Sequence, residues 1–160
     1  MKSREEKTNA IRLLEQKKLP FKVHDYSQSD AVNGMEIADY LHENPDRVFK
    51  TLVTVGKSAS HYVFLVPVSR ELDLKKAAKA VNEKSIDMIK SKELLPLTGY
   101  IHGGCSPVGM KKFFPTIIDE SAEIFDEIFF SGGKIGLQIE MSLSELRKVI
   151  TFKLADIAAP

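Results

Sequence analysis

The sequence predicts an α/β domain in which a mixed β-sheet, curved or partly closed, is surrounded by helices. Two β-branched segments, 48–55 and 61–66, are separated by the turn at 56–60, which is the pattern of an antiparallel hairpin. Other strand candidates are separated by helical segments, a pattern typical of mixed α/β folds. The 160 residues are 43% hydrophobic and 28% charged, which fits one globular domain over 1–160.

The amino-terminal part predicts two helices and a strand. Residues 5–18 predict a helix, because Ile11 and Leu14 fall on one face and Pro20 ends the segment. Residues 21–26 alternate in polarity and predict a strand. A second, short helix stops before Asn44-Pro45. Its apolar positions follow helical spacing and are Met35, Ile37, Ala38 and Leu41.

The rest of the chain predicts further short strands and helices. Asp73 is placed to cap a helix over 74–81, and Ser142-x-x-Glu145 is a capping box for a last helix that runs to Val149. Strands are predicted at 85–89, 113–118, 127–130 and 135–141, a helical turn at 91–95, and either a strand or an extended tail at 151–154. The turn at 131–134 joins two of these strands.

Composition and charge exclude several classes of protein. One cysteine excludes an internal disulfide and a multi-cysteine zinc module, and the longest apolar run, 62–68, is far shorter than the ~18 residues of a membrane span. A cytoplasmic location is therefore expected. Residues 115–160 hold eight acidic and four basic residues, net −4, which leaves +5 for 1–114. That asymmetry permits a weak polyanion partner but lacks the strongly basic face of a dedicated nucleic-acid binder.

Familiar cofactor motifs are missing. The 104–109 segment has P-loop glycine spacing, but Met110 stands where the lysine is needed and Pro107 removes a backbone donor. His42-Glu43 is followed by Asn44-Pro45, so it is not a helical zinc motif. The sequence therefore predicts no metal site.

Lys50 is the first candidate functional residue. Two-residue periodicity puts it on the same strand face as Val48 and Leu52, while Thr51 faces the other way. An unpaired buried ammonium is costly, so this lysine must reach water or a polar cleft. Two interpretations stay open: an edge-strand lysine that deters aggregation, or a pocket cation that binds a phosphate or a developing oxyanion.

The loop at 99–109 is the second candidate. Its four glycines and one proline require unusual backbone shapes, and such loops present N–H groups to an anion or a carbonyl. A plain connection between strands explains the composition equally well. Cys105 lies three residues after His102, so a cysteine–histidine nucleophile is one interpretation and a small buried apolar residue is the other. Taken alone, Tyr26 and the turn at 131–134 need no function.

Three separated segments together resemble the signature of the YbaK/EbsC family, free-standing trans-editing proteins related to the insertion domain of bacterial prolyl-tRNA synthetase. They are Val48-Phe49-Lys50-Thr51-Leu52, Gly103-Gly104-Cys105-Ser106-Pro107-Val108-Gly109 and Ser131-Gly132-Gly133-Lys134. Matches at 73–76, 115–119 and 155–158 extend the resemblance over essentially the whole chain. The chain looks closest to the YbaK branch, the Cys-tRNA(Pro) deacylases.

The resemblance implies a single α/β domain whose mixed sheet closes into a barrel-like core, without a metal or organic cofactor. It implies removal of mischarged cysteine from tRNA(Pro), with the acceptor end of that tRNA and a transient complex with prolyl-tRNA synthetase as partners, and neither DNA nor a membrane. Lys50 is the implied catalytic residue, which holds the phosphate and ribose of the terminal adenosine. The implied substrate-binding residues are Tyr26, Thr51, Gly103, Gly104 and Ser131, the two glycines through their backbone.

The family mechanism implied by the resemblance uses no protein nucleophile. The thiol of the substrate cysteine attacks its own ester, a geometry that can supply ~7–11 kcal/mol of effective concentration. Gln138 stands where the YbaK branch often has an aspartate, so no role is carried over to it. Two alternatives stay open: deacylation of another mischarged tRNA, such as Ala-tRNA(Pro), by water, and a non-catalytic module that binds tRNA or the synthetase.

Overall fold

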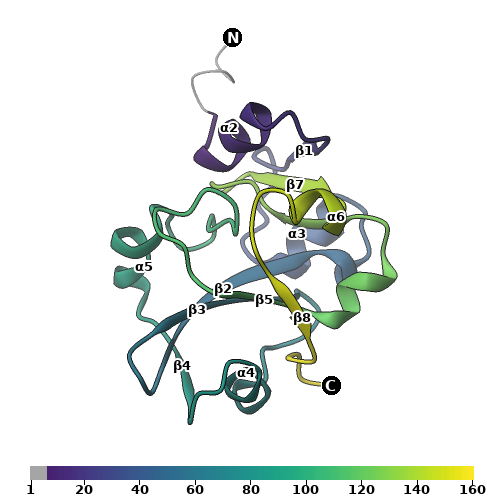
Figure 1. The fold of residues 1–160 in the computed structure, drawn as a ribbon. Coiled ribbons are helices and arrows are strands. Elements are labelled where there is room, and N and C mark those ends of the chain that lie inside the picture. The colour runs from purple at the N-terminus through teal and green to yellow at the C-terminus, as the bar shows by residue number, and fades with distance from the viewer. Residues whose placement is uncertain (1–6) are drawn as a thin grey trace.

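The computed structural model describes residues 7–160 as two β-sheets with helices around them (Figure 1). The three-stranded sheet has the order β1 (Lys22–Asp25), β7 (Leu137–Met141), β6 (Ile128–Ser131). The five-stranded sheet has the order β4 (Ile86–Met88), β2 (Phe49–Gly56), β3 (His61–Pro67), β5 (Thr116–Asp119), β8 (Lys153–Ala155). β2 and β3 form the predicted hairpin, whereas β3–β5 and β5–β8 are parallel pairs. The predicted mixed sheet is confirmed.

The predicted closure into a barrel is wrong. Within residues 7–160 neither sheet closes on itself, and a single parallel bridge, Val48 to Phe129, links the two. Closure needs a continuous ladder of backbone hydrogen bonds around the sheet. Here the apolar faces are covered instead by packing the two sheets together. Their shared core takes Val63 and Leu65 from one sheet and Phe130 and Ile139 from the other.

The helices begin largely where the sequence predicts them, because their caps are local. They are α2 (Asn9–Gln16), α3 (Gly34–Tyr40), α4 (Leu74–Ala80), α5 (Ser91–Thr98) and α6 (Leu143–Leu146). Thr8, Asn33, Asp73 and Ser142 each accept a backbone N–H at the start of α2, α3, α4 and α6 respectively. The first helix is shorter than the predicted 5–18, because residues 7, 8, 17 and 18 are not helical. Residues 5 and 6 lie outside the described residues.

Several boundaries differ from the prediction. The last helix ends at Leu146 rather than Val149, and the predicted turn at 91–95 is a helix that continues to Thr98 with Pro96 inside it. The predicted strand at 113–118 begins at Thr116, and the segment at 151–154 contributes to a true strand, β8. Two 3₁₀ helices, η1 (Pro45–Arg47) and η2 (Glu120–Ile124), were not predicted.

The carboxy-terminal anchor is a group of polar contacts that ties residues 157–159 to the five-stranded sheet. Asp119, 2% exposed, accepts the backbone N–H groups of Ile157 and Ala158, both at 3.0 Å. Arg70 Nε donates to the Ala159 carbonyl at 2.8 Å, and Lys76 Nζ donates to the Ala158 carbonyl at 3.1 Å. Burial alone would raise the pKa of Asp119, but the hydrogen bonds from Ser121, Ile157 and Ala158 lower it below its usual value.

A second network holds the three-stranded sheet together. Glu140 in β7 accepts from His24 Nε2 at 2.8 Å and from Arg47 at 3.1 Å, and the Arg47 guanidinium lies over the Phe129 ring, 4.9 Å from its centre. Burial opposes ionisation of Glu140, yet the hydrogen bond from His24, with Glu127 and the nearby cations Lys22 and Arg47, keeps its pKa lowered.

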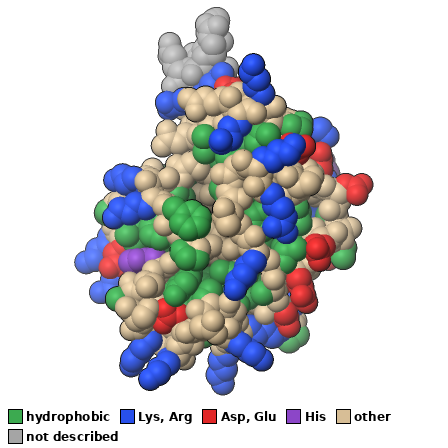
Figure 2. All heavy atoms as spheres, in the orientation of Figure 1, with side chains coloured by type: hydrophobic (Ala, Val, Ile, Leu, Met, Phe, Trp, Pro, Cys, Tyr) green, Lys and Arg blue, Asp and Glu red, His purple; other side chains and the backbone are tan. Residues whose placement is uncertain are grey.

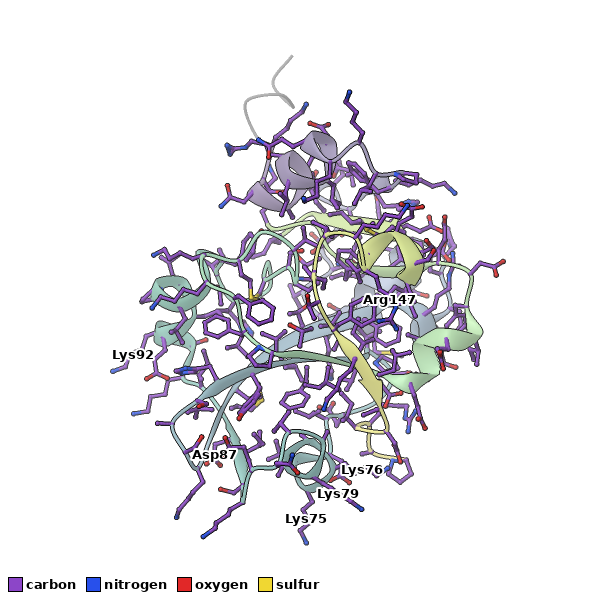
Figure 3. All side chains as sticks on the ribbon, in the orientation of Figure 1. Lys75, Lys76, Lys79, Asp87, Lys92 and Arg147 are labelled. Carbon is purple, nitrogen blue, oxygen red and sulfur yellow. The ribbon has the colours of Figure 1, made fainter. Side chains whose placement is uncertain are left out.

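Charged side chains are unevenly placed on the surface. Figure 2 shows Lys and Arg side chains spread over the visible face, while Asp and Glu gather toward one side of it. Lys75 and Lys79 on α4 and Lys92 on α5 point outward from the fold (Figure 3).

Candidate functional site

A cavity of about 360 Å³ lies where the two sheets meet. One wall is the first half of β2, from Phe49 to Val53. The others come from the start of α3, the segment from β4 into α5, the 102–105 part of the glycine-rich loop, and β6 and β7. The residues from β6 and β7 are Ser131 and Gln138.

Four of the six predicted site residues line this cavity: Lys50, Thr51, Gly103 and Ser131. Tyr26 does not; its side chain is 3% exposed and its backbone N–H donates to the Gly136 carbonyl at 2.8 Å. Gly104 is also outside the lining residues.

Lys50 lies in the half of β2 that β4 leaves uncovered, because β4 pairs only with residues 54–56. Its side chain is 28% exposed, and Nζ lies 3.2 Å from a carboxylate oxygen of Glu71, which is 84% exposed. Such an exposed ion pair is weak and contributes little to holding Lys50 in place. Lys50 therefore fits both interpretations of the sequence: it lies on an open strand edge, and it is a cation that lines the cavity.

The glycine-rich loop reaches the cavity through tight packing. Gly103 has φ +87°, a conformation that side chains disfavour. A Cβ on Gly104 would stand 2.8 Å from Lys134 Cα, so the loop packs directly on the turn after β6. Tyr100 ties the loop to itself by donating its hydroxyl to the Val108 carbonyl at 2.6 Å. The loop is thereby held at a fixed place beside Ser131.

Cys105 lines the cavity but is not poised as a nucleophile. Its side chain is buried, and burial raises the pKa of its thiol to about 12. A thiol with that pKa is protonated at neutral pH, whereas attack needs the thiolate. His102, its suggested partner, is exposed. The geometry therefore disfavours the cysteine–histidine interpretation.

Gln138 and Thr51 each bury a polar atom in the cavity wall. Gln138 is 5% exposed, and neither its Oε1 nor Thr51 Oγ1 has a hydrogen-bond partner among the described residues. The sequence analysis left Gln138 without a role. The signal was present, because the hairpin of β6 and β7 pairs Gln138 directly with Ser131, a residue that it did select.

The chemistry that the cavity offers is binding and polarisation rather than acid–base catalysis. Within residues 7–160, none of the side chains that line it is an aspartate or a glutamate. Over the same residues no group of three or more His, Cys, Asp or Glu side chains has a geometry that could hold a metal ion. The cavity supplies two cations (Lys50 and Lys90), three hydroxyls (Thr51, Ser91 and Ser131), the amides of Asn33 and Gln138, a buried neutral thiol and the loop backbone. No helix in the described part of the chain is both long and apolar enough to cross a membrane.

Comparison with known proteins confirms the family resemblance. The family described as aminoacyl-tRNA editing domain matches residues 30–149. The chain is 43% identical over 157 residues to the proposed Cys-tRNA(Pro)/Cys-tRNA(Cys) deacylase EbsC of Enterococcus faecalis, covering 98% of this chain and 96% of that protein.

Two solved structures have a similar fold. A crystal structure of a proposed trans-editing enzyme for prolyl-tRNA synthetase superposes with a TM-score of 0.83 at 26% identity, over 95% of this chain and 96% of that one. A hypothetical protein with 19% identity superposes with a TM-score of 0.85, over 94% and 99% of the two chains, and shares the fold.

Proposed function

This chain belongs to the aminoacyl-tRNA editing domain family, and on that premise we propose that it removes mischarged cysteine from tRNA(Pro). The 43% identical relative named for Cys-tRNA(Pro) and Cys-tRNA(Cys) supports this substrate. The observation that carries the proposal is the content of the cavity. It holds cations at Lys50 and Lys90 but, among the described residues, no carboxylate and no thiolate.

A site without its own nucleophile suits a substrate that supplies one. In the proposed reaction the sulfur of the esterified cysteine attacks its own carbonyl carbon. The new S–C bond forms as the ester C–O bond breaks, the thiol proton goes to the departing ribose oxygen, and a cyclic thioester and free tRNA result. Orientation provides most of the rate in such an intramolecular step. Alanine and proline esters have no thiol and would be spared.

The proposed roles follow the positions of the residues. Lys50 binds the phosphate and ribose of the terminal adenosine, displacing Glu71, and Thr51 assists from the neighbouring position of β2. The backbone at Gly103 and Gly104 holds the ester. Ser131 shapes the pocket from its lining, and Tyr26 is proposed to assist from its buried position outside the lining.

Selection of tRNA(Pro) is proposed to depend on a transient complex with prolyl-tRNA synthetase, in the cytoplasm where tRNA is charged. The support is the weak charge asymmetry: net +5 over residues 1–114 attracts RNA only modestly. Co-elution of all three components, and not of protein with tRNA alone, is the expected result of a mixing experiment.

A substrate panel tests the proposed reaction. Purified protein is incubated with tRNA(Pro) carrying cysteine, serine, S-methylcysteine or alanine, and loss of the ester is followed. Serine and S-methylcysteine bracket cysteine in size, and neither has a free thiol. Loss of cysteine alone is expected. Loss of S-methylcysteine or alanine would favour water as the nucleophile and a different substrate, and a stable tRNA complex that never releases an amino acid would leave a binding module.

A further inference from the structure

The Gln138 carboxamide is the group in the cavity that the proposed reaction leaves without a task. Four buried side-chain oxygens lack a hydrogen-bond partner among the described residues: Thr51 Oγ1, Ser121 Oγ, Gln138 Oε1 and Glu145 Oε1. Glu145 Oε1 lies 3.2 Å from Lys148 Nζ, and the Ser121 hydroxyl lies at Asp119, whose pKa it lowers. The other two line the cavity.

These two oxygens differ in what they require. A threonine hydroxyl rotates and can donate or accept, so Thr51 can form a hydrogen bond with many kinds of ligand group. A carboxamide oxygen can only accept. An acceptor that is 95% buried and unpaired costs free energy, so a donor supplied by a ligand is what Gln138 Oε1 requires.

The sheet holds Gln138 firmly in this position. Its strand, β7, lies between β1 and β6, and Gln138 pairs across the strands with His24 on one side and Ser131 on the other. Cross-strand partners share a face of the sheet, so Ser131 and Gln138 form one polar strip along the cavity wall. Because the side chain is already ordered, little conformational entropy is lost when it binds a ligand.

We propose that the Gln138 side-chain oxygen binds the α-amino group of the aminoacyl ester. This inference rests on the proposed function, because it assumes an aminoacyl ester in the cavity. That ester carries one strong donor, its α-ammonium group. No Asp or Glu within 7–160 lines the cavity, so a carboxylate is not available to receive it. The two cations of the lining, Lys50 and Lys90, repel the ammonium, which directs the amino group to the β6–β7 wall.

Gln138 would then recognise the α-amino group that all aminoacyl esters share, and not the side chain of the amino acid. Its loss would weaken binding of an aminoacyl group but not of the same acyl group without its amine. A purely structural role would affect the two ligands equally. The ratio of the two affinities therefore separates the two roles.

Binding of two non-hydrolysable ligands tests this difference. They are 3′-deoxy-3′-(cysteinylamino)adenosine and its counterpart with a 3-mercaptopropionyl group, which lacks the amine. Dissociation constants are measured by calorimetry for wild type, Gln138→Leu and Gln138→Glu. Gln16→Leu, the same exchange at an exposed position of α2, is the matched control.

Wild type and Gln16→Leu are expected to prefer the amine-bearing ligand by about 10- to 100-fold, the range of one hydrogen bond to a charged group. Gln138→Leu should bind both ligands almost equally. Gln138→Glu keeps an acceptor oxygen at the same place in either protonation state and should retain the preference. The thermal midpoint of Gln138→Leu should stay unchanged or rise, because the variant removes an unpaired buried oxygen.

Each other outcome overturns the inference. An undiminished preference in Gln138→Leu would do so, as would an equal weakening of both ligands with a lowered midpoint, and so would a wild type that binds neither ligand. The proposed function is tested separately by release of cysteine from Cys-tRNA(Pro). A protein that shows the Gln138-dependent preference but never releases cysteine would retain this inference and lose the proposed reaction.

Discussion

The carboxy-terminal anchor and the cavity treat buried polar groups in opposite ways. Asp119 and Gln138 lie in strands β5 and β7 and are 2% and 5% exposed. Asp119 accepts the N–H groups of Ser121, Ile157 and Ala158, whereas Gln138 Oε1 accepts none from the described residues. A paired buried group stabilises the fold, and an unpaired one destabilises it unless a ligand completes it. Changes in the anchor should therefore alter stability, and changes in the cavity should alter activity.

The largest expected effect tests the cavity side of that contrast. Lys50→Ala should lower kcat/KM for Cys-tRNA(Pro) by about 10³-fold, because the variant loses the charge that holds the substrate and the developing transition state. The thermal midpoint should change little, since the pair with exposed Glu71 contributes little stability.

The matched control is Lys75→Ala, which removes an outward-pointing lysine from α4 (Figure 3). It should leave kcat/KM unchanged. Activity of Lys50→Ala within threefold of wild type would show that Lys50 belongs with the surface lysines and not with the cavity.

The second effect tests the anchor. Asp119→Asn keeps the size of the side chain but replaces a charged acceptor, and it should lower the free energy of unfolding by about 3 kcal/mol. Urea denaturation followed by circular dichroism measures this change. The kcat per folded molecule should stay within twofold of wild type. A large loss of kcat with unchanged stability would remove the distinction between the two regions.

Features that depend on residues close together in the sequence could be predicted, and features that depend on distant residues could not. The hairpin, the Asp73 cap and the Ser142 cap were predictable, because each is specified by neighbours within a few residues. The parallel pairing of β8 with β5 was not, because it joins residues more than 30 positions apart through the anchor. The barrel-like closure was implied by the family resemblance, and the strand patterns could not test it because they indicate strands but not closure.

The cavity was predicted unevenly for the same reason. Lys50 stood out because a charge in an apolar strand is anomalous on its own. Gln138 did not, since a glutamine in a strand segment of alternating polarity is ordinary. Its pairing with Ser131 follows from the hairpin, but the burial of its oxygen without a partner is seen only in the folded structure. Tyr26 is predicted by the resemblance, and the fold buries it outside the residues that line the cavity.

The stability of the protein should fall at low pH because of two carboxylates. The pKa values of Asp119 and Glu140 are lowered in the folded protein. Unfolded carboxyls have pKa values of about 3.9 and 4.3, so the stability that these groups contribute is complete above that range. This stability is lost as the pH falls from the pKa values of the unfolded chain toward the lower pKa values of the folded protein. Over that range the unfolded chain binds more protons than the folded protein does.

The measurable quantity is the slope of the unfolding free energy against pH below about pH 4. Each carboxylate contributes at most about 1.4 kcal/mol per pH unit there. Asp119→Asn should reduce the slope by up to that amount, whereas Gln138→Glu should not reduce it. An unaltered slope in Asp119→Asn would mean that the anchor carboxylate is not held ionised by its three N–H partners.

The smallest effect concerns Cys105, which lines the cavity as a buried, neutral thiol. With a pKa of about 12, its thiolate fraction at pH 8 is about one in ten thousand, against roughly a quarter for an ordinary thiol. A thiol reagent should therefore modify the native protein slowly and the urea-unfolded protein at once. Cys105→Ala should keep kcat/KM within twofold of wild type and lower the free energy of unfolding by about 1 kcal/mol, the typical cost of a small buried truncation. A loss of activity comparable to that of Lys50→Ala, in a folded protein, would instead make the protein thiol the nucleophile. The substrate would then no longer need to provide its own, and the specificity for cysteine would need another cause.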